Sequence, residues 1–410
     1  MWKNTFISYT TLFRSRLGIM IPILQTIGSR THRPENLIRA LKKEFFENVT
    51  IKSTDQDWQS VKSYLVEKGY ISTKPKILGR FKGISCRRPD NGEIKLSKDS
   101  TEIHELNITR LDHWYSQPYM LSTIGVPTED NLDEYLEMCL DFKVVNKNFQ
   151  SLRLGNTIQK ILLQVNKDKI FEPNLSNLKP YFLKLLLESD FYIIFAMLKS
   201  IGSSNQKFTR DDIVRQFPDI AQDALKICEN VIKSQNINRD LKKFCKLIKE
   251  TSEKSKKKGN SGGPGVLEHR VTPRLEWLVD LGILSKTGFK RNSFNYKSTE
   301  VLSKLTILLE QVLKDNSKLM EAVLSVGEFD LNKDGNFKDL IEAYKILSGT
   351  IGSVSIDDLI MTTCINSKIT NPRDLRQILM ERKDDKGVRF TGGRYSRQAE
   401  FVWFDKKIYN

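Results

Sequence analysis

The sequence predicts a mainly α fold with small β-wings, made of tandem winged-helix (helix-turn-helix) domains joined by helices. The first observation is a helix followed by a glycine, an apolar pair and a basic ribbon, a pattern found at 64–88 and again at 275–297. The second is a shorter pattern of helix, strand, turn, strand and helix at 134–161. The third is the unequal spacing of these copies, which excludes a solenoid. We therefore expect four domains, at 1–110, 111–185, 186–320 and 321–410.

The charge of the chain indicates a polyanionic partner. Its 410 residues include 66 Lys and Arg against 50 Asp and Glu, which gives a net charge of +16. Such a balance favours nucleic acid first and an anionic membrane surface second. No run of about 18 apolar residues occurs, so no membrane span is expected. Five dispersed cysteines without a Cys-x-x-Cys pair favour a cytoplasmic protein with reduced thiols and argue against a zinc module.

The first domain opens with a basic segment. Residues 1–34 contain no acidic side chain, which is compatible with a mitochondrial transit peptide. The preferred interpretation is a helix packed on the first domain, because Leu17, Met20 and Leu24 recur at helical spacing. We expect further helices at 34–46, started by proline, and at 55–68, capped by Thr54.

A basic ribbon follows these helices and would form the first wing. Its candidate DNA-contacting residues are Arg80, Lys82, Arg87 and Arg88. The tetrapeptide at 89–92, Pro-Asp-Asn-Gly, has turn chemistry and would close the hairpin. Farther along, residues 174–201 are strongly apolar and predict buried helices that join the second and third domains. Thr209 with Asp212 then signals the start of another helix.

The third domain contains a lysine-rich loop followed by a helix and a hairpin. Lys256, Lys257 and Lys258 precede a glycine-rich stretch at 259–265. Thr272 and Pro273 predict a helix start, Gly282 predicts its end, and a strand should begin at 283–284. A basic hairpin is expected at 286–297, with Lys290, Arg291 and Asn292 near its tip, and a long helix from 299 to about 326.

The last domain repeats this order. Asn371 and Pro372 predict the start of a helix at 373–383. A hairpin around 391–393 should follow, with Arg394 and Arg397 before an apolar strand at 401–404. Winged-helix units place a helix in the major groove, while wing residues contact the DNA backbone or the minor groove.

In this order of features the chain resembles the DNA-recognition half of type IIS restriction endonucleases. Trp2, Thr10-Thr11 and Arg14 resemble the opening of that family, although the proline expected after the arginine is absent. Residues 141–161 and 173–201 are similar to its second subdomain, and 253–265 with 270–283 to its third. The resemblance implies successive winged-helix subdomains that recognise DNA. The nuclease domain that follows them in the family is not found.

Catalytic patterns are incomplete in the sequence. Asp385 with Asp405 and Lys407 has the acid and acid-x-lysine letters of a magnesium-dependent nuclease, as have Asp90, Glu93 and Lys95 across a tight turn. Residues 330–341 resemble a calcium loop, but their glutamate comes one position late, at 342. The stretch at 259–265 lacks the Gly-Lys-Ser/Thr of a phosphate-binding loop. We therefore predict a non-catalytic chain without metal or cofactor.

Lysine and arginine side chains of the ribbons and their leading helices are the expected contacts to phosphates. Arg270 and Arg274, at the start of the third-domain helix, and Asn292 on its wing are the predicted base readers. The hypothesis is a double-stranded DNA-binding protein without a membrane partner. It would serve as the specificity or accessory subunit of a bacterial restriction or anti-phage defence system, with a separate nuclease or ATPase subunit. The alternatives are a winged-helix protein–protein adaptor and a nuclease that uses Asp385, Asp405 and Lys407.

Overall fold

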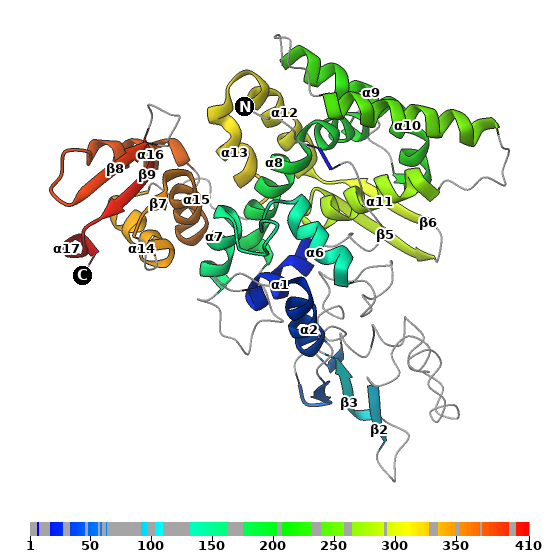
Figure 1. Ribbon diagram of the computed structural model, residues 1–410, viewed down its shortest axis with the longest axis horizontal. Helices are drawn as coiled ribbons and strands as arrows, with labels where there is room; N and C mark the ends of the chain where they lie inside the picture. The colour runs from blue at the N-terminus through cyan, green and yellow to red at the C-terminus, as the bar shows by residue number, and fades with distance from the viewer. Residues whose placement is uncertain are drawn as a thin grey trace.

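The computed structural model shows a mainly helical protein with small three-stranded antiparallel sheets (Figure 1), which confirms the mainly α prediction with small β elements. The structure describes residues 6–7, 17–27, 33–45, 48–55, 58–59, 63, 92–96, 103–109, 132–162, 175–202, 207–231, 239–257, 265–290, 293–327, 335–348, 352–369, 371–392 and 399–409. Among these, no helix is long and apolar enough to cross a membrane.

The N-terminal part consists of short helices followed by a sheet. The 3-10 helix η2 (Leu17–Ile19) leads into α1 (Met20–Ile27) and then α2 (Pro34–Phe45). Residues Met20, Ile21, Ile23, Leu24 and Ile27 are at most 1% exposed, so the expected packed N-terminal helix is confirmed in this stretch. The sheet has β3 (Ile103–Thr109) between β1 (Asn48–Lys52) and β2 (Gly92–Leu96), all antiparallel.

The predicted helix–strand–turn–strand–helix at 134–161 is present in a reduced form. Helix α6 (Leu132–Asp141) and helix α7 (Arg153–Leu162) are joined by a tight loop with a single antiparallel bridge between Val145 and Ser151. The Asn146 side chain closes this loop by accepting from the backbone N–H of Gln150 at 3.0 Å. A full two-stranded wing is therefore absent from this part of the structure.

Gly155 allows α7 to lie directly against this loop. A Cβ atom at Gly155 would come within 2.2 Å of the carbonyl oxygen of Val144, and a backbone atom cannot move aside as a side chain can. Gly155→Ala is expected to lower the free energy of unfolding by about 1–3 kcal/mol, the usual cost of overpacking. Urea unfolding of this variant should be compared with Ser303→Ala, a substitution on an exposed helix face. Equal midpoints for both variants would show that the loop can shift.

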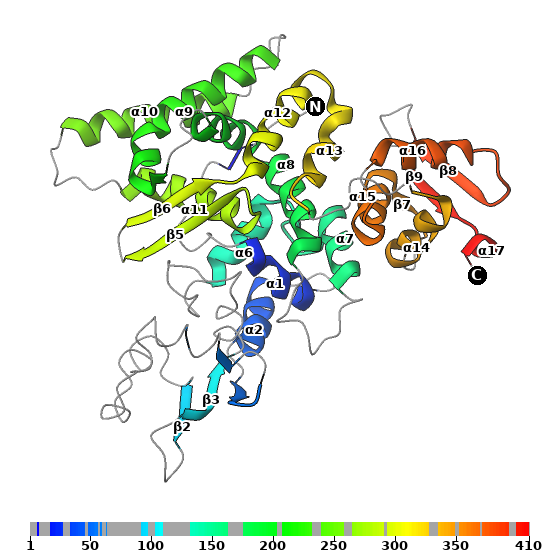
Figure 2. The ribbon, with the colours of Figure 1, turned by 180° about the vertical axis from the view of Figure 1, so that it is seen from behind.

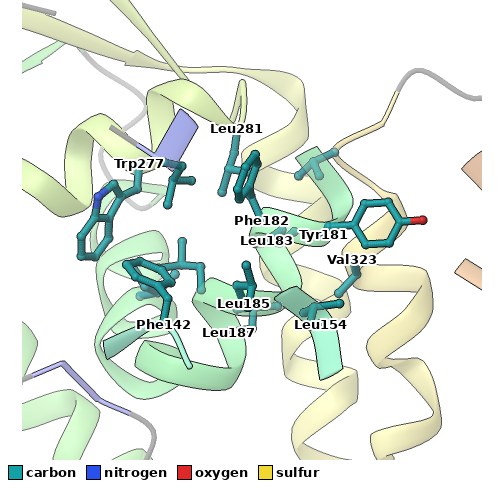
Figure 3. Close-up of a cluster of buried hydrophobic side chains, with 14 of the residues drawn as sticks. Phe142, Leu154, Tyr181, Phe182, Leu183, Leu185, Leu187, Trp277, Leu281 and Val323 are labelled. Carbon is teal, nitrogen blue, oxygen red and sulfur yellow. The ribbon is translucent and has the colours of Figure 1, made fainter. Parts of the chain in front are cut away.

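Helix α8 (Leu175–Gly202) forms the centre of the molecule. It is bent at Asp190, whose φ/ψ of −145°/29° is not helical. Its apolar side chains pack with those of α6, α7 and α11 (Gly265–Asp280) in a cluster that includes Phe142, Phe182 and Trp277 (Figure 3). Phe142 and Trp277 meet edge to face, with ring centroids 5.1 Å apart. The prediction of buried helices at 174–201 is therefore confirmed.

The central unit is built around a second sheet. It contains β4 (Phe208–Thr209), α9 (Arg210–Val231), α10 (Arg239–Lys257), α11 (Gly265–Asp280), β5 (Leu284–Lys290) and β6 (Ser293–Ser298). Thr209 and Asp212 cap α9 reciprocally, as expected, with N–H···O distances of 2.8 and 3.2 Å. Gly282, with a φ of +74°, lies in the turn that follows α11. The hairpin predicted at 286–297 is present as β5 and β6, at 284–298.

The predicted helix start at Thr272–Pro273 is wrong. Helix α11 begins at Gly265, and Pro273 lies inside it. An internal proline removes a backbone hydrogen bond, but α11 packs against α9 and α10, and side chains from Arg270 to Leu278 are buried. Packing on nearly all sides therefore keeps the helix continuous through the proline.

The long helix expected up to residue 326 is broken. Helix α12 (Glu300–Lys314) ends at Asp315, followed by the 3-10 helix η7 (Asn316–Lys318) and α13 (Leu319–Leu324). The Asp315 carboxylate accepts from the N–H and the hydroxyl of Ser317, at 2.9 and 2.7 Å. These bonds compete with the helical ladder and end α12.

The C-terminal unit contains the third sheet. Its elements are α14 (Phe337–Ser348), β7 (Val354–Ser355), α15 (Ile356–Ser367), α16 (Pro372–Glu381), β8 (Val388–Gly392), β9 (Ala399–Phe404) and α17 (Lys406–Tyr409). The helix after Asn371–Pro372 and the following hairpin were both predicted. Both views show this unit at one end of the molecule, beside α7 and α13 (Figures 1 and 2).

The same strand order recurs in all three sheets. In each, the last strand lies between the first and the second: β1-β3-β2, β4-β6-β5 and β7-β9-β8. In the central and C-terminal units a two-residue first strand leads directly into a helix, and a later helix leads into the hairpin. The chain therefore uses one small helix-and-hairpin design more than once.

Candidate nucleic-acid interface

Helix α16 is the second of two helices joined by a tight turn in the C-terminal unit. Asn371 caps it by accepting from the N–H of Arg373 at 3.2 Å, and Pro372 occupies the first turn, where no N–H is required. Leu375 and Leu379 are fully buried against the unit, with exposures of 0%. One face of α16 therefore anchors it, and the other remains open to a partner.

A tight turn sets α16 at an angle to α15. Lys368 adopts a left-handed conformation, with a φ of 54°, and its N–H donates to the carbonyl oxygen of Cys364. The N–H of Ile369 donates to the same oxygen at 2.9 Å, and the Ile369 side chain is buried. Two helices joined by such a short turn are the arrangement in which a helix-turn-helix protein presents its second helix to the major groove.

The open face of α16 carries side chains suited to bases and phosphates. Arg373, Asp374, Arg376 and Gln377 are all exposed in its first two turns. Arg373 pairs with Glu321 at 3.0 Å and Arg376 pairs with Asp357, and the two arginine side chains are 55% and 46% exposed. Exposed ion pairs contribute little net stability, about 0–1 kcal/mol. Either arginine can therefore exchange its carboxylate for a phosphate or a guanine edge.

The β8–β9 hairpin follows α16 and adds a further cation. The Arg389 guanidinium lies over the Trp403 ring, 4.9 Å from its centroid, and the Arg389 residue is exposed. Gly352 makes room for Trp403, since a Cβ there would come within 2.5 Å of the indole Nε1. The indole thus holds Arg389 on the outer side of the hairpin.

A buried polar cluster joins the C-terminal unit to α7 and α8. The Asp358 carboxylate on α15 contacts Lys184 Nζ at 3.0 Å, Arg153 Nε at 3.4 Å and Thr157 Oγ1 at 3.3 Å. Beside it, the Tyr181 and Thr362 hydroxyls lie 2.6 Å apart. Because buried polar groups must be paired, this cluster favours one orientation of the unit.

The titration of Asp358 gives a testable pH dependence. Burial raises the pKa of this carboxyl, but Lys184 and Arg153 outweigh burial and hold the pKa below its ordinary value. A pKa lower in the folded than in the unfolded state adds stability above pH about 3.9, which is lost as pH falls through the folded pKa. In Asp358→Asn, the free energy of unfolding measured with urea should therefore fall less with decreasing pH than it does in the wild type. The same decrease in both proteins would contradict the ion pair.

The structure corrects the two predicted base readers on α11. Arg274 is 0% exposed and forms a bidentate pair with Asp190, with Nε–Oδ2 and Nη2–Oδ1 distances of 2.6 and 3.1 Å. It also donates to the carbonyl oxygens of Arg270 and Ile7, at 2.6 and 2.8 Å. Arg270 is 7% exposed and lies over the Phe244 ring. Both arginines therefore belong to the core, and α11 does not present them to DNA.

Three of the other predicted DNA contacts lie in described elements. Lys256 and Lys257 lie in the last turn of α10, and Lys290 ends β5. Most lie outside the described residues: Arg80, Lys82, Arg87, Arg88, Lys258, Arg291, Asn292, Arg394 and Arg397. Sequence reasoning missed Arg373, Arg376 and Gln377, although the helix start at Asn371–Pro372 was a signal that could have found them.

The residues of the alternative nuclease site lie in unsuitable elements. Lys407 is in the short helix α17 instead of on a strand, and Asp385 lies in a turn, paired with Arg382 at 3.1 Å. Within the described residues, no group of three or more His, Cys, Asp and Glu side chains could hold a metal ion. Near the calcium-loop resemblance, Asn336 and Asp339 cap α14 reciprocally at 3.1 Å each, while 328–334 lie outside the described residues.

No protein-family model, no curated protein and no solved structure matches this chain.

Proposed function

We propose that this protein binds double-stranded DNA through a winged-helix unit at 337–404, in which α16 lies against the major groove and the β8–β9 hairpin is the wing. The observation that carries the proposal is the open face of α16, with Arg373, Arg376 and Gln377 on a capped helix that follows a tight turn. Arginine suits guanine and phosphate, and glutamine suits adenine.

Two further features support this proposal. The first is the strand order β7-β9-β8, with helices before and after the first strand, which fits a helix-turn-helix core closed by a wing. The second is the net charge of +16, which favours association with a polyanion. A recognition or accessory role in a restriction or anti-phage system, with catalysis on another chain, is part of the proposal and rests on the resemblance to restriction enzymes.

A titration of duplex binding against salt tests the proposal. A long mixed-sequence duplex should raise the fluorescence anisotropy signal at about 50 mM salt, and its affinity should fall at least tenfold by about 200 mM, because bound phosphates release counterions. Absence of binding at the lower salt concentration would contradict the proposal.

The adaptor alternative is favoured by one observation. Asp374 and Glu381 share the exposed face of α16 with the arginines, so an acidic and basic protein surface could also pair there. Binding of a protein partner that survives high salt, together with no binding of the duplex at low salt, would support this alternative.

A further inference from the structure

Helix α10 is an addition to the repeated design. In the C-terminal unit, α15 and α16 are separated by residues 368–371, whereas the corresponding helices α9 and α11 are separated by residues 232–264, which contain α10. The shorter connection shows that the repeated design does not require a helix at this position. Helix α10 is therefore a candidate for a separate role.

The inner face of α10 is already occupied. Leu241, Phe244, Cys245 and Ile248 are at most 5% exposed, and the helix packs on α9 and α11. The Cys245 thiol donates to the carbonyl oxygen of Ala221 at 2.9 Å, and the Phe244 ring packs against Phe6 with centroids 5.3 Å apart. Helix α10 is thus held firmly, and its remaining face is free for a partner.

The outer face of α10 is basic. Over residues 239–253 it carries five basic and three acidic residues, all of them exposed. Lys242 pairs with Glu229 at 3.5 Å and Lys246 with Glu250 at 3.9 Å. The exposed Lys243 and Lys249 make no ion pair with any residue that the structure describes. The four ammonium groups at 242–249, two of which make ion pairs at 3.5 and 3.9 Å, lie along about 10 Å of helix and suit a row of phosphates.

We infer that α10 is a second DNA-contacting surface, which holds the phosphate backbone through Lys242, Lys243, Lys246 and Lys249 without reading bases. Lysine is a compact point charge, so it binds phosphates without the planar specificity of arginine. An anionic membrane fits less well, because an interfacial helix buries its apolar face in lipid. In α10, Leu241, Phe244, Cys245 and Ile248 are covered by protein, and Leu247, 49% exposed, is a single apolar side chain among the exposed lysines.

This inference rests on the proposed function and extends it to a distant part of the chain. In both views α10 and α16 lie toward opposite ends of the molecule (Figures 1 and 2). The two surfaces are therefore separate contacts, and each can be removed without altering the other.

The test compares Lys243→Glu/Lys249→Glu on α10 with Lys304→Glu/Lys314→Glu, an equal charge change on exposed positions of α12. With a long mixed-sequence duplex, the α10 variant should bind at least tenfold more weakly, and its log–log salt slope should fall by about 2, one for each lost phosphate contact. The α12 variant should bind more tightly than the α10 variant and keep the wild-type slope. Circular dichroism should show equal helix content in all three proteins.

Three results would overturn the inference in distinguishable ways. If the wild type binds the duplex and the α10 variant binds with the same affinity and slope, the inference fails and the proposed function stands. If the wild type does not bind the duplex at all, both fail. Phosphatidylserine vesicles serve as the second probe: α10-dependent vesicle binding with unchanged duplex binding would assign the helix to a membrane surface instead.

Discussion

Replacement of Arg274 by alanine is expected to lower the free energy of unfolding by about 3–5 kcal/mol, because it leaves the buried Asp190 carboxylate without its partner. Both side chains are 0% exposed. Burial raises the pKa of Asp190, and the Arg274 guanidinium opposes that rise. Asp190 also accepts from the N–H of Ile7 at 2.8 Å, so the pair ties α8, α11 and the N-terminal segment together. Urea unfolding followed by circular dichroism measures the loss.

Two further variants make this prediction specific. Arg215→Ala removes an arginine that is 75% exposed on α9 and should change stability by less than about 0.5 kcal/mol. The double replacement Arg274→Met/Asp190→Leu should regain much of the stability, because it removes both buried charges together. A stable Arg274→Ala protein that has lost DNA binding would contradict the core assignment and return Arg274 to the interface.

Replacement of both Arg373 and Arg376 by alanine is expected to weaken duplex binding about 30-fold or more. The reason is that each arginine contact to a base edge is worth about 1–3 kcal/mol. Stability should change little, since both arginines are about half-exposed and their ion pairs with Glu321 and Asp357 are weak in water. Anisotropy titration measures the affinity, and urea unfolding checks the fold.

The matched control is Arg39→Ala/Arg215→Ala, which removes the same charge from exposed positions on α2 and α9. It should bind the duplex at least fivefold more tightly than the α16 variant. If the two double variants lose affinity equally, binding depends on the total charge and not on α16, and the proposed interface is wrong.

Local signals predicted much of the fold. The helix start at Asn371–Pro372, the reciprocal cap of Thr209 and Asp212 and the stop at Gly282 each depend on neighbouring residues, so they can be recognised in the sequence. The break after Lys314 also has a local signal, the Asp-Asn-Ser cluster at 315–317, in which the Asp315 carboxylate accepts from the N–H of Ser317.

The role of α11 could not be predicted in the same way. Arg274 is paired with Asp190, 84 positions earlier in the chain, and no local pattern shows that pairing. An arginine near an expected helix start looks the same in sequence whether it faces DNA or a buried carboxylate. The proposed interface helix, α16, has the same local signals, and the burial of Leu375 and Leu379 on one side leaves its other face exposed.

Photo-cross-linking from α16 tests the central claim most directly. A photoreactive amino acid at Gln377, on the exposed face of α16, should cross-link to a bound mixed-sequence duplex. The same group at Lys345, on the exposed side of α14 within the same unit, should give little product. Equal cross-linking from both positions, or none from Gln377 under conditions where the duplex is bound, would contradict the claim that α16 lies against DNA.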